Sequence, residues 1–165
     1  MRGVCKLILI LFFVAASNVA WTMGESRMVT DGLVGKPAPD FTLDTLQEKK
    51  VDMTQYRAGH DAIIFFWATW CPHCREQIKE LNAHAADIAQ KGIKILLVDI
   101  GEEEGLVRAH AERHQIKMDV FLDRDSSVSE TYRIIGVPTF YFVDKKGIIK
   151  DVDHALPEHY EELFK

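Results

Sequence analysis

The feature that most constrains this 165-residue chain is a Cys-Pro-His-Cys segment, residues 71–74, at the junction of a strand pattern and a helix pattern. Residues 62–68 form a short apolar run rich in β-branched and aromatic residues, which is typical of an interior strand. After the segment, apolar residues recur at helical spacing as far as Lys91 and Gly92. The sequence therefore places two cysteines at the first turn of a helix that follows a buried strand.

The spacing of the two cysteines predicts thiol chemistry. Cys71 and Cys74 are one helical turn apart, so their sulfur atoms can meet and close a small disulfide ring. The unpaired N–H groups and positive dipole end of a helix stabilise a thiolate, and Pro72 suits the first helical position. We expect Cys71, at the cap, to be exposed and to exchange with a partner's sulfur. We expect Cys74 to be shielded and to resolve the mixed disulfide.

Half of a zinc site and a structural disulfide are two other roles for such a pair. A zinc site normally needs a second pair of ligands at matching spacing, and the sequence has no second Cys-x-x-Cys. His110 and His114 lie four residues apart on one predicted helix. They share a face with Leu106 and Val107, which favours half-buried packing over metal binding. We expect neither a metal site nor a cofactor.

The first 22 residues differ from the rest of the chain. Arg2 and Lys6 accompany an unbroken apolar run, residues 7–16, and small residues follow it. This arrangement is typical of a secretory signal peptide, because the run is shorter than the ~18–20 residues of a spanning helix. A retained short membrane anchor is the alternative. We therefore expect export to the periplasm or the extracytoplasmic face of a membrane, where a partner must recycle a reactive cysteine pair.

The remaining chain is acidic and has room for one domain. Without residues 1–22 it carries 18 basic and 25 acidic residues, a formal charge of about −7. That balance argues against nucleic acid as a partner, since nucleic acid selects basic surfaces. Residues 23–33 are polar and unpatterned and indicate a flexible lead segment, so we expect one monomeric folded domain over residues 34–165.

The pattern of elements predicts a single α/β domain. A second interior strand at residues 93–100 completes a parallel βαβ unit, and residues 40–43 with 50–53 predict a hairpin beside the main sheet. The other expected elements are a helix at 102–115, a short strand at 119–122, a helix at 126–134, a hairpin of 139–144 with 148–152, and a last helix begun by residues 156–157. The acidic run 102–104 suits a helix start and needs no further function.

Several segments together resemble exported thioredoxin-fold proteins of the TlpA, ResA and DsbE type. The segments are residues 35–43, 66–75, 136–140 and 143–149, and an extra helix and strand between residues 102 and 122. The resemblance covers residues 34–165. It implies a thioredoxin fold, with a central mixed sheet of about five strands flanked by helices, an N-terminal β-hairpin and an inserted helix and strand.

The resemblance also implies an activity. The activity is that of a thiol-disulfide oxidoreductase, which exchanges a Cys71–Cys74 disulfide with cysteine-bearing protein substrates. The resemblance also suggests cytochrome c maturation as the setting and a membrane protein as the redox partner. It implies a cis Val137–Pro138 bond packed against the cysteines, which leaves the backbone of Val137 free to pair with an extended substrate segment. Trp70 matches the family's tryptophan before the first cysteine, and we expect it to form a partly exposed apolar docking surface.

The direction of electron flow stays open. His73 lies between the cysteines, and it can donate a hydrogen bond to the Cys71 thiolate or, when charged, pair with it. The Pro-His dipeptide is similar to that of the strong oxidant DsbA, whereas the whole chain resembles TlpA-type proteins, which mostly act as reductants. Stabilising the thiolate favours the reduced form and makes the disulfide more oxidising.

The proton acceptor of Cys74 is open as well. Thioredoxins carry a buried aspartate where this chain has Phe65, and TlpA-type proteins usually carry a glutamate where it has Gln77. A buried carboxylate there would accept the proton of the resolving thiol. Without one, the candidates are Glu76, His73 and water.

Three other functions share part of the pattern. A DsbA-like dithiol oxidase would use the same cysteines. A copper chaperone would add a distant histidine such as His154, but such proteins typically separate their cysteines by three residues, and a proline beside the site would occlude the metal. A peroxidase pattern needs a threonine three residues before its cysteine, and Thr69 lies only two before Cys71.

Overall fold

A computed structural model describes residues 32–47 and 50–165 of the chain. The predicted signal peptide or anchor at residues 1–22, and nearly all of the lead segment at 23–33, lie outside the described residues. Within the part of the chain that the structure describes, none of the helices has the length and apolar character needed to span a bilayer.

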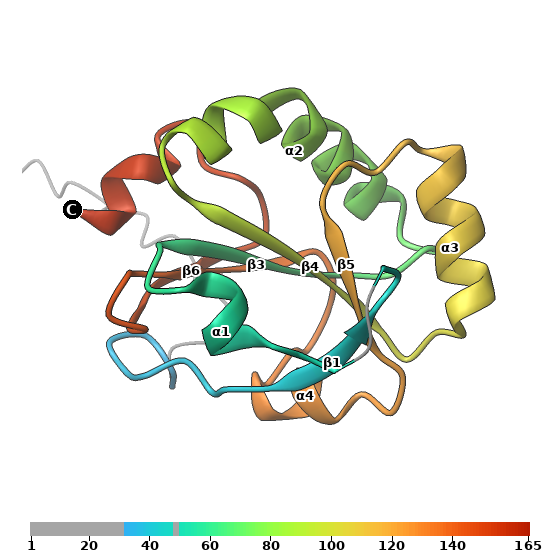
Figure 1. The fold of residues 1–165 in the computed structure, drawn as a ribbon, viewed down its shortest axis with the longest axis horizontal. Helices are drawn as coiled ribbons and strands as arrows, with labels where there is room; N and C mark the ends of the chain where they lie inside the picture. The colour runs from blue at the N-terminus through green and yellow to red at the C-terminus, as the bar shows by residue number, and fades with distance from the viewer. Residues whose placement is uncertain (1–31, 48–49) are drawn as a thin grey trace, which may run out of the picture.

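A seven-stranded mixed sheet runs through the molecule in the order β2-β1-β5-β4-β3-β6-β7 (Figure 1). The strands are β1 Thr42–Thr45, β2 Val51–Asp52, β3 Ala62–Trp67, β4 Lys94–Ile100, β5 Asp119–Asp123, β6 Thr139–Val143 and β7 Ile149–Asp153. β3, β4 and β5 run parallel, and every other pairing is antiparallel. The predicted βαβ unit and both hairpins are confirmed, and the N-terminal hairpin joins the sheet edge through β1 and β5.

Helices cover both faces of this sheet (Figure 1). α2, Pro72–Gln90, and α3, Glu104–Arg113, pack on one face together with a 3-10 helix, η1, at Tyr160–Phe164. α1, Met53–Arg57, and α4, Ser127–Thr131, pack on the other. This arrangement confirms the expected thioredoxin-type α/β architecture.

β3 is the strand that positions the cysteines. It lies between β4 and β6, and all six of its residues are buried. Phe65 and Trp67 point into the apolar cluster under α2, while Ile64 and Phe66 point into the cluster on the opposite face. Because both faces of β3 are packed, the turn that leaves its C-terminal end starts from a fixed place.

The ends of two expected helices are corrected by the structure. α4 covers only Ser127–Thr131 instead of residues 126–134, because Ser126 and Arg133 adopt positive φ of 61° and 56° and so bound a single turn. The last helix is the 3-10 helix η1, which starts at Tyr160, whereas we expected a helix from residue 156. The backbone N–H of Leu156 instead donates to Gln77 Oε1 at 2.8 Å, which ties this segment to α2.

α1 was not predicted. It has five residues, too few for apolar periodicity to appear in the sequence. Its start is set by the side chain of Asp52, which accepts a hydrogen bond from the backbone N–H of Gln55 at 2.8 Å. α3 is also shorter than the expected 102–115, since Glu103 is its N-cap.

Candidate active site

The N-terminus of α2 holds the cysteine pair as the sequence predicts. Cys71 is the N-cap residue, and Pro72 occupies the first turn. The backbone N–H of Cys74 donates a hydrogen bond to Cys71 Sγ over 3.1 Å, so the sulfur takes the place of a capping oxygen. The Cys71 sulfur therefore sits at the positive end of a 19-residue helix.

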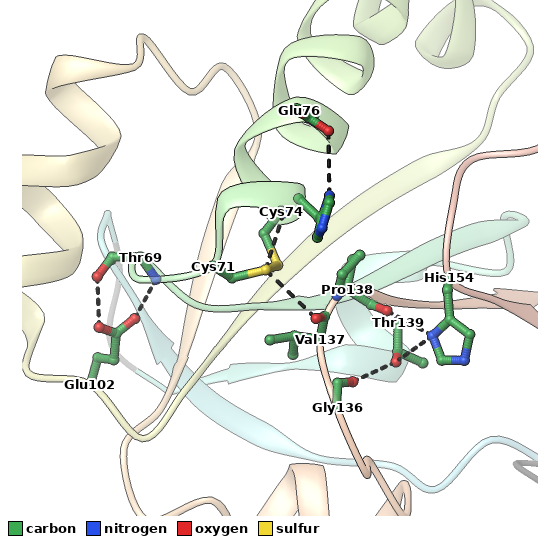
Figure 2. Close-up of a disulfide and its surroundings, with 11 residues drawn as sticks. Thr69, Cys71, Cys74, Glu76, Glu102, Gly136, Val137, Pro138, Thr139 and His154 are labelled. Atoms are coloured by element: carbon green, nitrogen blue, oxygen red, sulfur yellow. Dashed lines mark hydrogen bonds and ion pairs between the residues drawn. A yellow bond between two sulfur atoms is a disulfide. The ribbon is translucent and has the colours of Figure 1, made fainter. Parts of the chain in front are cut away.

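Cys71 and Cys74 form a disulfide, with their Cα atoms 5.3 Å apart (Figure 2). The structure is thus the oxidised form, in which the pair carries no thiol proton. The predicted meeting of the two sulfurs across one helical turn is confirmed.

The expected exposure of Cys71 is corrected. Cys74 is fully buried, and Cys71 is only 3% exposed. Cys71 is thus the more exposed of the two, as expected, but it is itself buried. The carbonyl oxygen of Val137 lies 3.6 Å from Cys71 Sγ, and Val137 packs against the apolar clusters on both faces of the sheet. Because this segment lies against the sulfur, an incoming partner meets only a small part of Cys71 in the disulfide form.

The Val137–Pro138 peptide bond is cis, as the resemblance implied. Figure 2 shows the Val137 carbonyl directed at the disulfide, on the segment that leads into β6. In the reduced protein, the thiol of Cys71 could donate to this carbonyl. The structure thus brings Cys71 together with the Val137–Pro138 segment, although Cys71 and Val137 are 66 residues apart in sequence.

In the disulfide form the partner of His73 is Glu76, and the contact expected with a Cys71 thiolate stays a prediction for the reduced protein. His73 Nδ1 lies 3.6 Å from Glu76 Oε2, and the two side chains are 79% and 75% exposed. A disulfide carries no charge with which the ring could pair, and the N-terminal turn of α2 directs this side chain into solvent. An ion pair at such an exposed place contributes little to stability.

Trp70 is exposed, as expected, and borders an apolar groove. Its side chain is 71% exposed, and that of Ile135 is 84% exposed. We call the hollow that they border the Trp70–Ile135 groove. It is lined by Ala68, Trp70, Ile100, Ser129, Ile134, Ile135, Gly136 and Val137. The groove therefore runs from the tryptophan beside Cys71 to the segment that carries the cis-proline.

Phe65 and Gln77 stand where related proteins carry a buried acid, and neither can accept a proton from Cys74. Phe65 stacks on Phe140 with ring centroids 4.3 Å apart, and Gln77 bonds the C-terminal segment as described above. His110 is half-buried against Trp67, with ring centroids 5.4 Å apart, which confirms the predicted packing for this residue, whereas His114 is exposed. Burial lowers the pKa of His110.

His154 entered the sequence analysis only as the distant histidine of a copper chaperone, and the structure gives it a different place, against the cis-proline segment. Its Nδ1 lies 2.8 Å from the carbonyl oxygen of Pro138 and 3.3 Å from Thr139 Oγ1. Since that carbonyl can only accept, Nδ1 carries the hydrogen. Figure 2 places His154 behind the cis-proline segment, on the side away from the sulfurs. The β6–β7 hairpin makes this contact, and no local spacing in the sequence reveals it.

Two acidic residues near the cysteines were missed. Asp99, on β4, is fully buried. Its burial first, and then the neighbouring Glu102, raise its pKa to about 9. Glu102 accepts hydrogen bonds from Thr69 N–H at 2.6 Å and from Thr69 Oγ1 at 2.7 Å (Figure 2). The acidic run 102–104 predicted only a helix start for Glu102, and α3 begins two residues later.

Comparison with known proteins gives consistent results. The model of the AhpC/TSA family matches residues 34–152. The thiol-disulfide oxidoreductase ResA of Geobacillus kaustophilus (strain HTA426) is 32% identical over 151 residues, which cover 92% of this chain and 86% of that protein. ResA of Bacillus thuringiensis subsp. konkukian (strain 97-27) is 26% identical over 166 residues, 99% of this chain and 95% of the relative.

A solved structure assigned to a thiol:disulfide interchange protein DsbE from Chlorobium tepidum has a TM-score of 0.70 and 25% identity, and covers 79% of this chain and 92% of its own. The family match and the ResA relatives agree with the fold and with the paired cysteines at the start of α2. The chain therefore belongs to the AhpC/TSA family of thioredoxin-like proteins and is a thiol-disulfide oxidoreductase similar to ResA and DsbE.

Proposed function

We propose that this protein exchanges disulfides with protein substrates on the extracytoplasmic side of a membrane and that a membrane protein restores its working redox state. The observation that carries the proposal is the Cys71–Cys74 disulfide at the N-terminus of α2, with the cis Val137–Pro138 segment against it. Export rests on residues 1–22, whose pattern is that of a signal peptide. Cytochrome c maturation is the setting that the resemblance suggests.

The chemistry follows from the order of burial of the two sulfurs. In the reductive direction, the Cys71 thiolate attacks a substrate disulfide, forms a mixed disulfide and releases the first substrate thiolate. Cys74 then loses its proton, and its thiolate attacks the Cys71 sulfur. That attack releases the second substrate thiolate and leaves the Cys71–Cys74 disulfide, so the two electrons pass to the substrate.

The helix N-terminus favours this assignment of roles. Cys71 Sγ already accepts the Cys74 N–H, and a thiolate would accept that bond more strongly than a disulfide sulfur. Cys74 lies deeper, in the apolar cluster under α2. It is therefore suited to attack within the protein and unsuited to meet a substrate first.

The Trp70–Ile135 groove is suited to an extended, apolar substrate segment. It is continuous with Val137, whose backbone borders the disulfide. A segment laid there would pass its cysteine over Cys71, and the exposed Trp70 and Ile135 would cover its apolar neighbours. His154 supports the Val137–Pro138 segment of the protein from the other side, through its hydrogen bond to the Pro138 carbonyl.

Of the two directions, we favour reduction of substrate. The whole-chain resemblance extends over residues 34–165, whereas the resemblance to the oxidant DsbA rests on the dipeptide Pro72-His73 and on Val137 before the proline. A peroxidase role is disfavoured, because the hydroxyl of Thr69 is already engaged by Glu102.

Replacing Cys71 with serine should abolish reduction of insulin by dithiothreitol-recycled protein, because the attacking sulfur is lost. Cys74→Ser should instead accumulate a mixed disulfide with substrate, since nothing resolves it. Non-reducing electrophoresis detects that adduct. In the full chain, Cys5→Ser changes the cysteine within residues 1–22 and should keep full activity. Activity that survives in Cys71→Ser would contradict the proposal.

Trp70→Ala should raise the KM for a protein substrate about tenfold and change kcat little, because an exposed aromatic anchor contributes on the order of 1–2 kcal/mol to binding. Leu106→Ala removes a comparably exposed apolar side chain on α3, outside the groove, and serves as control. Steady-state kinetics separate KM from kcat. An unchanged KM in Trp70→Ala would remove the groove from the binding site.

The equilibrium with glutathione tests the direction of electron flow. For a reductant we expect a potential below about −230 mV, and a potential near −120 to −150 mV would assign the protein to the oxidants instead. Quenching at defined ratios of reduced to oxidised glutathione, followed by thiol counting, gives the value.

A further inference from the structure

Four buried polar atoms lack a hydrogen-bond partner on the face of the sheet that α2 and α3 cover. Within residues 32–47 and 50–165, they are Trp67 Nε1, His110 Nε2 and both carboxyl oxygens of Asp99, whose interaction with the neighbouring Glu102 lacks the geometry of a regular hydrogen bond. Native proteins leave few such atoms, and each one calls for an explanation. Trp67 and Asp99 are directly paired in the parallel β3–β4 ladder, and the His110 ring packs on Trp67. The unpartnered atoms thus form one cluster close to the start of α2.

Glu102 links this cluster to the turn that carries Cys71. Both of its carboxylate oxygens are used by Thr69, one by the backbone N–H and one by the hydroxyl (Figure 2). Thr69 lies between the end of β3 and Cys71, and Cys71 N–H in turn donates to the carbonyl of Ala68 at 3.2 Å. A charge-assisted pair of hydrogen bonds at this point restricts where the turn can place the Cys71 sulfur.

Repulsion between like charges decides which of the two carboxyl groups, Asp99 or Glu102, carries a proton. Asp99 and Glu102 interact directly, and two neighbouring carboxyls do not both ionise readily in a buried place. Asp99 is fully buried and its pKa is about 9, so it is the protonated member at neutral pH. Asp123, at the end of β5, adds a further negative charge, although its oxygens accept the N–H groups of Val128 and Ser129.

Two cations face the same cluster through His110. Arg75 on α2 and Arg113 on α3 both act on that ring, and His114 and Glu102 do so as well. The cluster therefore receives charge from β4, β5, α2 and α3. The raised pKa of Asp99 has burial as its largest cause, followed by Glu102 and then by Asp123.

We propose that Glu102 is a positioning residue for the exchange reaction, whose carboxylate holds Thr69 and hence Cys71 in place, and that Asp99 is the neutral acid that allows this carboxylate to stay charged. The Glu102 carboxylate keeps its hydrogen bonds to Thr69 as long as Asp99 and Glu102 together carry one proton. When Asp99 also ionises, two like charges face each other, and the hold on Thr69 weakens. The rate part of this proposal depends on the function proposed above, whereas the proton part does not.

The pH dependence has a definite sign. The pKa of Asp99 is raised in the folded protein above its ordinary value of 3.8, to about 9. Its contribution to stability is therefore complete below about pH 4 and is progressively lost as the pH rises to about 9. Above that pH the buried carboxylate is charged.

The first arm of the test is the rate of insulin reduction by the full chain at pH 7. Glu102→Gln should lower kcat about tenfold, since one charge-assisted hydrogen bond to Thr69 is lost, and should leave KM unchanged, because the Trp70–Ile135 groove is intact. Glu103→Gln is the matched control. It removes the same charge from the neighbouring residue, whose side chain makes no capping bond, and its kcat should stay within about twofold of wild type.

The second arm is the tryptophan fluorescence of the oxidised full chain between pH 6 and 10.5, where neither active-site cysteine can titrate. Wild type should show a transition near pH 9, and Asp99→Asn, which imitates the protonated acid, should show none. Glu102→Gln should move the midpoint to lower pH, because one cause of the raised pKa is removed. A merely structural role for Glu102 would leave this midpoint in place.

Two results would overturn the inference: equal kcat for Glu102→Gln and Glu103→Gln, or an alkaline transition that persists in Asp99→Asn. If wild type failed to reduce insulin at all, the proposed function would fall. The fluorescence arm would still report whether the two carboxyls share a proton.

Discussion

The structure depends on one hydrogen bond at the start of α2, from the backbone N–H of Cys74 to the sulfur of Cys71. A helix N-terminus has N–H groups without intrahelical partners, and here a sulfur accepts one of them. β3 delivers the chain to this point from the centre of the sheet, and Pro72 lets the helix begin at once. The same contact that caps the helix would stabilise the charge of an attacking sulfur, so folding and chemistry share it.

The residues around the Cys71 sulfur control access to it, whereas the start of α2 fixes its position. Val137 narrows the approach to Cys71, and the Trp70–Ile135 groove offers the one side from which we propose that substrate arrives. His154 contacts the cis-proline segment, and Glu102 contacts Thr69 in the turn before Cys71, so each supports one of the segments that border the sulfur. The cysteine pair itself is common to the fold. We infer that such supporting contacts adapt it to its partners.

Sequence reasoning worked where the signal was local and long enough. The apolar run of β3, the 19-residue periodicity of α2 and the cysteine spacing predicted the fold and the redox centre. α1, with five residues, was too short for a periodic signal. His154 and Glu102 act on residues 16 and 33 positions away, and only the sheet brings those partners together. Burial of Cys71 was also missed, since it depends on the distant Val137 segment.

The rate at which iodoacetamide alkylates Cys71 in the reduced protein, followed against pH, tests the central claim most directly. The folded protein should reach its plateau rate near neutral pH, well below the value of about 8.5 at which a free cysteine is half ionised. The same protein in urea should return to that ordinary value, because the helix N-terminus is gone. A folded profile that coincides with the unfolded one would contradict the account.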